Sequence, residues 1–322
     1  MTLPKRTLVP ILAALAVSTA AAADAFPSRP ITIVVHYPAG GTSDVQLRTI
    51  QEPLQRLLGQ PIIIDNKPGA SGAIAAKYVA TAKADGYTLM YPNNGVLITP
   101  LLTKKPTYDA LKDFKTVSLV TAVPMVLVSS KKVPATDLAG FLAYAKTRPE
   151  GLMYASAGTA SYGHLASTRL AQMAGIKVTH VPYKGEAGTT LAVRSGEVQM
   201  LLTTPSSSML GQVKEGNINM LGVATAQPSP VVPGVPTINT VVPGFTSEVW
   251  FGLLAPAGTP DDIIQKLNAA VRQVMSNDEI RAQLLPTGAL PRTSTPAEFA
   301  ALMASESAQW REITTKYKIE AD

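Results

Sequence analysis

One short stretch of this chain, residues 37–44, most narrows the folds that the chain can adopt. It reads Tyr-Pro-Ala-Gly-Gly-Thr-Ser-Asp and follows an apolar run at residues 31–35 that is typical of a buried strand. Apolar side chains at helical spacing come directly after it, at Leu47, Ile50, Leu54, Leu57 and Leu58. A strand that passes through a glycine pair into a helix is the building unit of an α/β sheet.

The same turn suits an anion. Two glycines let the backbone bend and approach a ligand closely. Thr42, Ser43 or Asp44 can cap the helix, whose free N–H groups and positive dipole end attract negative charge. The spacing of a phosphate-binding P-loop or of a dinucleotide-binding loop is absent. An ordinary strand-to-helix turn is the alternative interpretation.

Two side chains of this turn keep two possible roles. Asp44 either caps the helix without touching a ligand or accepts a hydrogen bond from a ligand amine or hydroxyl. Tyr37 either walls a cleft or packs against its neighbours.

Apolar runs alternate with helical patterns along the rest of the chain, which predicts parallel sheets with helices on both faces. Polar turns follow several of these runs, and ligands of such sheets sit beyond the carboxyl ends of the strands. The turns in question are Asn93-Asn94-Gly95, Ser156-Ala157-Gly158-Thr159-Ala160-Ser161 and Thr203-Thr204-Pro205-Ser206. Together with Thr42 and Ser43, the hydroxyls of Thr159 and Ser161 could hold an anion without any arginine.

Two strands are expected to cross between two lobes. Pro124 splits one apolar run, and residues 249–255 form the return crossing. The expected limits are 24–123 plus 249–322 for the first lobe and 124–248 for the second. The fold class is α/β, with two Rossmann-like domains joined by two crossover strands and a ligand cleft between them.

The C-terminal region predicts two helices that pack back on the first lobe. Their start signals are Thr259-Pro260-Asp261 and Thr295-Pro296-Ala297-Glu298, each with a Thr cap and a proline at the first helical position. Glu306 interrupts the apolar stripe of the last helix, so that face should be partly buried there. Pro53 should kink or break the helix that follows residue 44.

Residues 1–23 are typical of a secretory signal peptide, with Lys5 and Arg6 before an apolar stretch and three alanines before Asp24. An uncleaved anchor or a buried helix is the alternative. Without this segment the net charge is 26 − 22 = +4, because two of the 28 basic residues lie in it and all 22 acidic residues lie outside it. There is no cysteine and no basic run, so we expect no disulfide and no nucleic-acid partner. We expect a periplasmic monomer.

The residue types offer little for catalysis. The three histidines, His36, His164 and His180, have no metal-ligand spacing, and no metal or other cofactor is expected. Residues 159–163 resemble a G-x-S-x-G elbow but lack its first glycine. A serine hydrolase that uses Ser161 and His164 is the enzymatic alternative. Lys184 follows a strand and either supplies a cation to a ligand or is a solvated loop residue.

Nine segments of the chain, by their order and spacing, resemble the Bug-type receptors, which are the extracytoplasmic solute-binding proteins of tripartite tricarboxylate transporters. The resemblance covers the whole mature chain. The segments lie at residues 37–44, 59–61, 66–72, 85–89, 154–159, 164–166, 180–185 and 252–260, together with the signal peptide. The departures from the family pattern are Ala160 in the second turn, Glu186 after Lys184-Gly185, and Pro53.

The resemblance implies a two-lobed periplasmic-binding-protein fold, type II-like, that closes on a small carboxylate held between the turns at 37–44 and 156–161. It also implies delivery of that ligand to a membrane permease, and no catalysis. The ligand itself stays open among aliphatic di- or tricarboxylates, an acidic amino acid, and an aromatic carboxylate such as terephthalate. A sensor that presents its ligand to a signalling partner is the alternative to a transport receptor.

The sequence therefore yields one set of candidate ligand-binding residues, drawn from both lobes. They are Tyr37, Ala39, Gly40, Gly41, Thr42, Ser43, Asp44, Asn93, Asn94, Ser156, Ala157, Gly158, Thr159, Ser161, His164, Lys184 and Thr204.

Overall fold

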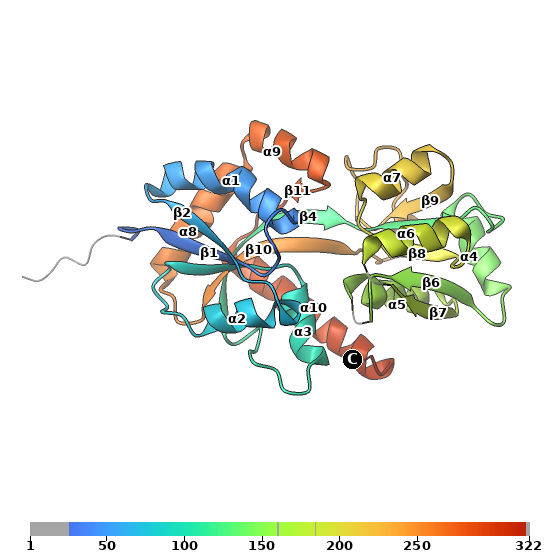
Figure 1. Ribbon diagram of the computed structural model, residues 1–322, viewed down its shortest axis with the longest axis horizontal. Coiled ribbons are helices and arrows are strands. Elements are labelled where there is room, and N and C mark those ends of the chain that lie inside the picture. The colour runs from blue at the N-terminus through green and yellow to red at the C-terminus, as the bar shows by residue number, and fades with distance from the viewer. Residues whose placement is uncertain (1–25, 160, 184, 320–322) are drawn as a thin grey trace, which may run out of the picture.

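The computed structural model describes residues 26–159, 161–183 and 185–319, which form two α/β lobes side by side (Figure 1). The expected signal peptide, Ala160, Lys184 and the side chain of Glu186 lie outside the described residues. None of the described helices combines the length and the apolar character that crossing a bilayer requires.

The sheet of the first lobe has the order β11-β4-β10-β3-β1-β2. Strand β1 pairs in parallel with β2 and β3, whereas β10 is antiparallel to both β3 and β4. The central strands are buried along nearly their whole length, as their continuous apolar runs predict. The strands are β1 Ile31–Val35, β2 Ile62–Asn66, β3 Thr88–Tyr91, β4 Phe114–Pro124, β10 Glu248–Pro256 and β11 Leu290–Pro291.

Helices cover both faces of this sheet. One face packs against α1 (Thr42–Leu58), α8 (Asp261–Met275) and α9 (Asp278–Leu284). The other face packs against α2 (Ala73–Ala80), α3 (Gly95–Leu102) and α10 (Pro296–Lys316). The C-terminal helices therefore do return to the first lobe, as the sequence predicts.

Helix α1 runs through Pro53 without a break. Of the expected kink or break, the break is therefore wrong. Proline removes one backbone hydrogen bond, at a cost of about 3 kcal/mol. Leu47, Ile50, Leu54 and Leu58 bury their side chains on both sides of Pro53, and this burial outweighs the lost bond. Gly59 ends the helix in a left-handed conformation, with φ of 70°.

The second lobe repeats the arrangement of the first. Its sheet has the order β7-β6-β8-β5-β9, in which β5 is antiparallel to β8 and β9 and takes the position that β10 has in the first sheet. Helices α4 and α5 pack on one face, and α6 and α7 on the other. The elements are β5 Val126–Ser130, α4 Leu138–Lys146, β6 Leu152–Ser156, α5 Tyr162–Ala174, β7 Val178–Pro182, α6 Glu186–Ser195, β8 Met200–Thr203, α7 Ser207–Lys214 and β9 Ile218–Val223.

The two connections between the lobes lie next to each other. Pro124 ends β4 opposite Glu248, which begins β10. Between the sheets, the Met125 N–H donates to the Ser247 carbonyl oxygen at 3.0 Å. In Figure 1, β4 and β10 run together through the gap between the two lobes. The lobe limits at 123/124 and 248/249 stay a prediction, which the change of sheet after Pro124 supports.

Short helical elements lie in two connecting segments. Helix α3 begins at Gly95, the last residue of the Asn-Asn-Gly turn, and a 3₁₀ turn at Ile238–Thr240 lies within the proline-rich segment at 227–244. Two further 3₁₀ turns lie at Ala70–Gly72 and Leu285–Thr287.

The two C-terminal start signals differ in outcome. The Thr295 side chain caps α10 and Glu298 completes a reciprocal capping box, as predicted. The predicted cap at Thr259 is wrong, because Pro260 is the N-cap of α8 and the Thr259 hydroxyl donates to the Pro256 carbonyl oxygen at 2.8 Å instead.

Candidate functional site

Three neighbouring cavities lie where the carboxyl ends of the two sheets face each other. A cavity of about 470 Å³ is lined by the start of α1, by the β8–α7 turn of the other lobe and by the crossing strands. Val123, Val249 and Phe251 form its apolar wall. The polar lining residues that the sequence predicts are Tyr37, Gly41, Thr42, Ser43, Asn93 and Thr204.

The other two cavities continue around the second turn. One of about 170 Å³ is lined by Ser156, Ala157, Ser161 and Thr204, and it shares Thr204 and Val249 with the first cavity. One of about 710 Å³ is lined by Tyr37, Asn93 and Asn94 from the first lobe, and by Ala157, Thr159 and Ser161 from the second. The three cavities together form one cleft, which we call the interlobe cleft, and most predicted site residues line it.

Asp44 lies beneath the first turn and does not line the interlobe cleft. Its Oδ2 accepts hydrogen bonds from the Gly40 N–H at 2.9 Å and from Arg48 Nε at 2.8 Å. Its Oδ1 accepts from Asn66 Nδ2 at 3.1 Å. These contacts, the Arg48 bond first, lower the pKa of Asp44.

The expected capping of α1 by Thr42, Ser43 or Asp44 is wrong, because Gly41 is the N-cap and makes no side-chain cap bond. The Asp44 carboxylate instead holds the turn in place from below.

Three buried polar atoms on the first-lobe side of the cleft have no hydrogen-bond partner among the described residues. They are Ser43 Oγ, His36 Nδ1 and Asn94 Oδ1. Ser43 and Asn94 are 1% and 0% exposed, and all three residues line the interlobe cleft. Burial lowers the pKa of His36 to about 4, so its ring is neutral at pH 7. An unpaired buried polar group is costly, so these three atoms indicate a missing polar partner in the cleft.

Two asparagine side chains make hydrogen bonds on the first-lobe side of the cleft. Asn93 Nδ2 donates to the Tyr37 hydroxyl at 3.1 Å, and Asn94 Nδ2 donates to the Glu248 carbonyl oxygen at 3.1 Å. Tyr37 itself is 41% exposed and lies against the His36 ring, with ring centroids 4.1 Å apart. Tyr37 therefore both packs and walls the cleft, which combines its two expected roles.

The second turn leads into α5. The Ser161 side chain is the N-cap of this helix and accepts a hydrogen bond from the His164 N–H at 3.3 Å. Gly158 has φ of 136°, a conformation that side-chain-bearing residues rarely adopt. Gly158, Ala39, Gly40 and Asp44 are predicted site residues that do not line the cleft, so their part in ligand binding stays a prediction.

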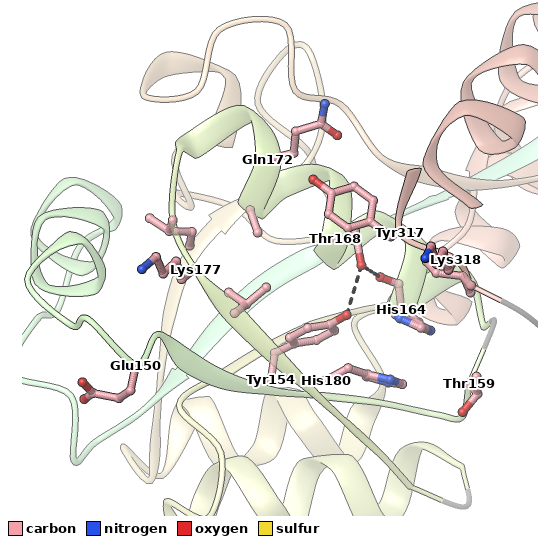
Figure 2. Close-up of a pocket in the computed structure, with 14 residues that line it drawn as sticks. Glu150, Tyr154, Thr159, His164, Thr168, Gln172, Lys177, His180, Tyr317 and Lys318 are labelled. Carbon is pink, nitrogen blue, oxygen red and sulfur yellow. Dashed lines mark hydrogen bonds between the residues drawn. The ribbon is translucent and has the colours of Figure 1, made fainter. Parts of the chain in front are cut away.

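His164 faces away from the cleft, into a cavity of about 850 Å³ behind the second turn that we call the rear cavity. Figure 2 shows the rings of His164, His180 and Tyr154 together in this cavity, with Thr159 at its far side. The Ser161 hydroxyl caps α5, and the His164 ring stacks on His180 at a centroid distance of 3.7 Å. This geometry does not support the serine hydrolase alternative, because His164 is not placed to activate Ser161 as a nucleophile.

The cleft attracts anions through helix ends instead of basic side chains. No lysine or arginine is among the described residues that line it. The N-termini of α1, α5 and α7 all meet the cleft at lining residues, and each dipole interaction is worth about 0.3–2 kcal/mol. The described residues contain no group of three or more His, Cys, Asp or Glu side chains that could hold a metal ion.

Sequence reasoning missed several lining residues. Phe251 lines the first cavity, and the turn at 68–72 and Thr99 line the third. Ser206, which belongs to the predicted turn at 203–206, lines the first cavity as the N-cap of α7. The turn at 68–72 could have been included, because it follows β2 at the same sheet edge as residues 37–44. The sequence does not indicate that Phe251 lines the cleft, because a buried strand residue has the same apolar pattern whether or not it faces a cleft.

Two lobes of matching topology, joined by two adjacent strands around a polar interlobe cleft, define a two-lobed periplasmic-binding-protein fold. Comparison with known proteins identifies the particular family. Residues 46–319 match the family described as Tripartite tricarboxylate transporter family receptor, and the chain belongs to this family as a Bug-type receptor. The family is one of solute-binding receptors and not of enzymes.

Solved structures resemble most of the chain. The structure of Rpa4515 from R. palustris with adipate is 34% identical, with a TM-score of 0.74, and the match covers 92% of this chain and 99% of that one. MatC from Rhodopseudomonas palustris with bound malate is 34% identical, with a TM-score of 0.69 and coverage of 89% and 99%. The periplasmic binding protein BugD is 27% identical, with a TM-score of 0.70 and coverage of 92% and 100%.

Proposed function

We propose that this protein is a periplasmic receptor that closes on a small dicarboxylate and delivers it to the permease of a tripartite tricarboxylate transporter. The observation that carries the proposal is the group of buried, unpartnered polar atoms on the cleft wall, at His36, Ser43 and Asn94. Ser43 Oγ and His36 Nδ1 can each donate to a carboxylate, and Asn94 Oδ1 can accept from a hydroxyl, so a dicarboxylate that also bears a hydroxyl would satisfy all three, whereas an apolar ligand would leave them unpaired.

The chemistry of the cleft favours an anion with an apolar middle over a neutral sugar. The free N–H groups at the starts of α1, α5 and α7 belong to both lobes. Together with the Ser43 hydroxyl, they can bind the carboxylate oxygens of one ligand from both sides at once. The apolar wall of Val123, Val249 and Phe251 fits the carbon chain between two carboxylates. Relatives solved with adipate and with malate carry ligands of this kind.

Capture requires the lobes to approach each other. We propose that they rotate about the adjacent crossings near residues 123–124 and 248–250, while the ligand bridges the turns at 37–44 and 156–161. The scattering radius of gyration in solution should therefore decrease when saturating ligand is added. An unchanged radius would contradict the closure while leaving the binding itself unaffected.

The test of the function is calorimetric titration of the mature protein with adipate, malate, citrate and terephthalate. At least one of these carboxylates should bind, and Ser43→Ala should weaken that binding about 10- to 100-fold, since a hydrogen bond to a charged group is lost. Ser129→Ala is the matched control, because Ser129 is equally buried and unpartnered among the described residues but lies in β5, away from the cleft. Absence of binding to every carboxylate would refute the proposal.

A further inference from the structure

His180 makes a close contact with the second turn although it does not line the interlobe cleft. It lies on β7, the edge strand next to β6, and its Nε2 is 2.7 Å from Ser156 Oγ. Ser156 ends β6 and begins the turn that leads to α5. His180 therefore contacts the turn from the rear cavity, on the side opposite the proposed ligand.

The Ser156 hydroxyl is fully used inside the protein. It donates its one hydrogen to the Gly158 carbonyl oxygen at 2.8 Å and accepts from the Gly158 N–H at 3.3 Å. With the hydroxyl hydrogen on the Gly158 contact, the imidazole donates the contact with Ser156 from a protonated Nε2. Ser156 is only 1% exposed, and it holds Gly158 at the φ of 136° that shapes the turn.

The imidazole of His180 also contacts the start of α5. It stacks face to face on His164, with centroids 3.7 Å apart and an interplanar angle of 14°. His164 lies in the first turn of α5, two residues after the helix begins. Tyr154 supports the pair from β6, with its ring centroid 5.1 Å from that of His180 (Figure 2). One side chain on β7 thus holds both ends of the turn.

We propose that His180 is a positioning residue for ligand binding, which fixes the turn at 156–161 and the start of α5 so that their N–H groups point into the interlobe cleft. This inference rests on the proposed function, because it assumes that the turn holds the ligand. His180 acts through Ser156 and His164 and does not touch the ligand.

Two substitutions separate the hydrogen bond from the stacking. His180→Phe keeps a flat ring of similar size but has no donor, whereas His180→Gln keeps a donor at the position of Nε2 but has no ring. The affinity for the carboxylate that binds best among adipate, malate, citrate and terephthalate should fall about tenfold in His180→Phe. It should stay within about threefold of the native value in His180→Gln. Thr179→Ala, on the exposed neighbour in β7, is the control and should change nothing.

Each outcome decides one statement. Native affinity in His180→Phe would overturn the positioning role alone. Equal loss in both variants would show that packing, and not the donor, matters. If the native protein binds none of the four carboxylates, the proposed function fails and this inference fails with it.

If His180→Phe does not fold, the nitrogen-15 spectrum of the native imidazoles decides. A proton on Nε2 of His180 supports the contact, and a proton on Nδ1 alone overturns it.

Discussion

Replacing Glu306 with glutamine should make this protein more stable at pH 8 and leave its stability nearly unchanged at pH 4.5. Glu306 lies on α10, where its Oε2 accepts a hydrogen bond from Trp250 Nε1 at 3.0 Å. It lines a cavity of about 270 Å³ on the side of the crossing strands that faces α10, together with Arg169 and Arg292. Burial raises the pKa of Glu306 from 4.5 to about 7, although the Trp250 hydrogen bond and the two arginines oppose the rise.

The size of the effect follows from linkage. A carboxyl group whose pKa is raised by folding stabilises the native state below its unfolded pKa and loses that contribution as the pH rises through the folded pKa. One pKa unit corresponds to about 1.4 kcal/mol. The rise from 4.5 to about 7 in Glu306 therefore costs about 3 kcal/mol of unfolding free energy at pH 8. At pH 4.5 the same calculation gives a loss of less than about 0.5 kcal/mol in the free energy of unfolding.

Glutamine has the same shape and keeps an oxygen that can accept from Trp250, but it has no charge to desolvate. Urea unfolding of the native protein and of Glu306→Gln at pH 4.5 and pH 8 measures the difference directly. Glu312→Gln, at an exposed position of the same helix, is the control for exchanging an acid for an amide and should change stability by less than about 0.5 kcal/mol. The reasoning is refuted if the Glu306 variant is less stable at pH 8, or if the gain is the same at both pH values.

Two further predictions concern stability. In the Glu306→Gln background, stability should fall from pH 6.5 to pH 4, because burial lowers the pKa of His36 and His164 from 6.5 to about 4 and the unfolded chain takes up their protons first. His36 and His164 each contribute up to about 3 kcal/mol, and His180, whose pKa burial also lowers, adds to them. The slope in urea unfolding should therefore decrease by less than half in His164→Gln, and a flat profile before that substitution would contradict this. Thr295→Ala should cost about 1 kcal/mol in thermal unfolding, through loss of the α10 capping box, whereas Thr315→Ala near the other end of α10 should cost little.

Local signals predicted the elements that depend on local chemistry. The strand at residues 31–35, the turn after it and the helix behind it are read from spacing, and the capping box at Thr295 from four consecutive residues. Pro124 marks the change from one sheet to the other for the same reason, since proline cannot donate to a central ladder. The two-lobed fold follows from repeating such units.

The rest depends on partners that are far apart in the sequence. Pro53 is tolerated because tertiary burial outweighs one backbone bond, and no window around it reveals that. One of the three hydrogen bonds to Asp44 comes from Asn66, 22 positions away, and one partner of Ser156 is His180, 24 positions away. Sequence reasoning could place the ligand turns at a sheet edge, but it could not tell which of their side chains face the ligand and which hold the turn from below.

The position of β10 within its sheet has a consequence for how the chain folds. This strand comes from residues 248–256, yet it lies between β4 and β3, so the first sheet stays in two halves until the chain is nearly complete. The second lobe is one continuous segment and needs no strand from elsewhere. Pairings of long sequence separation form late, because the intervening chain must first be ordered. The second lobe should therefore fold first, and the ligand turn at 156–161 should be shaped before its counterpart at 37–44 has a finished sheet beneath it.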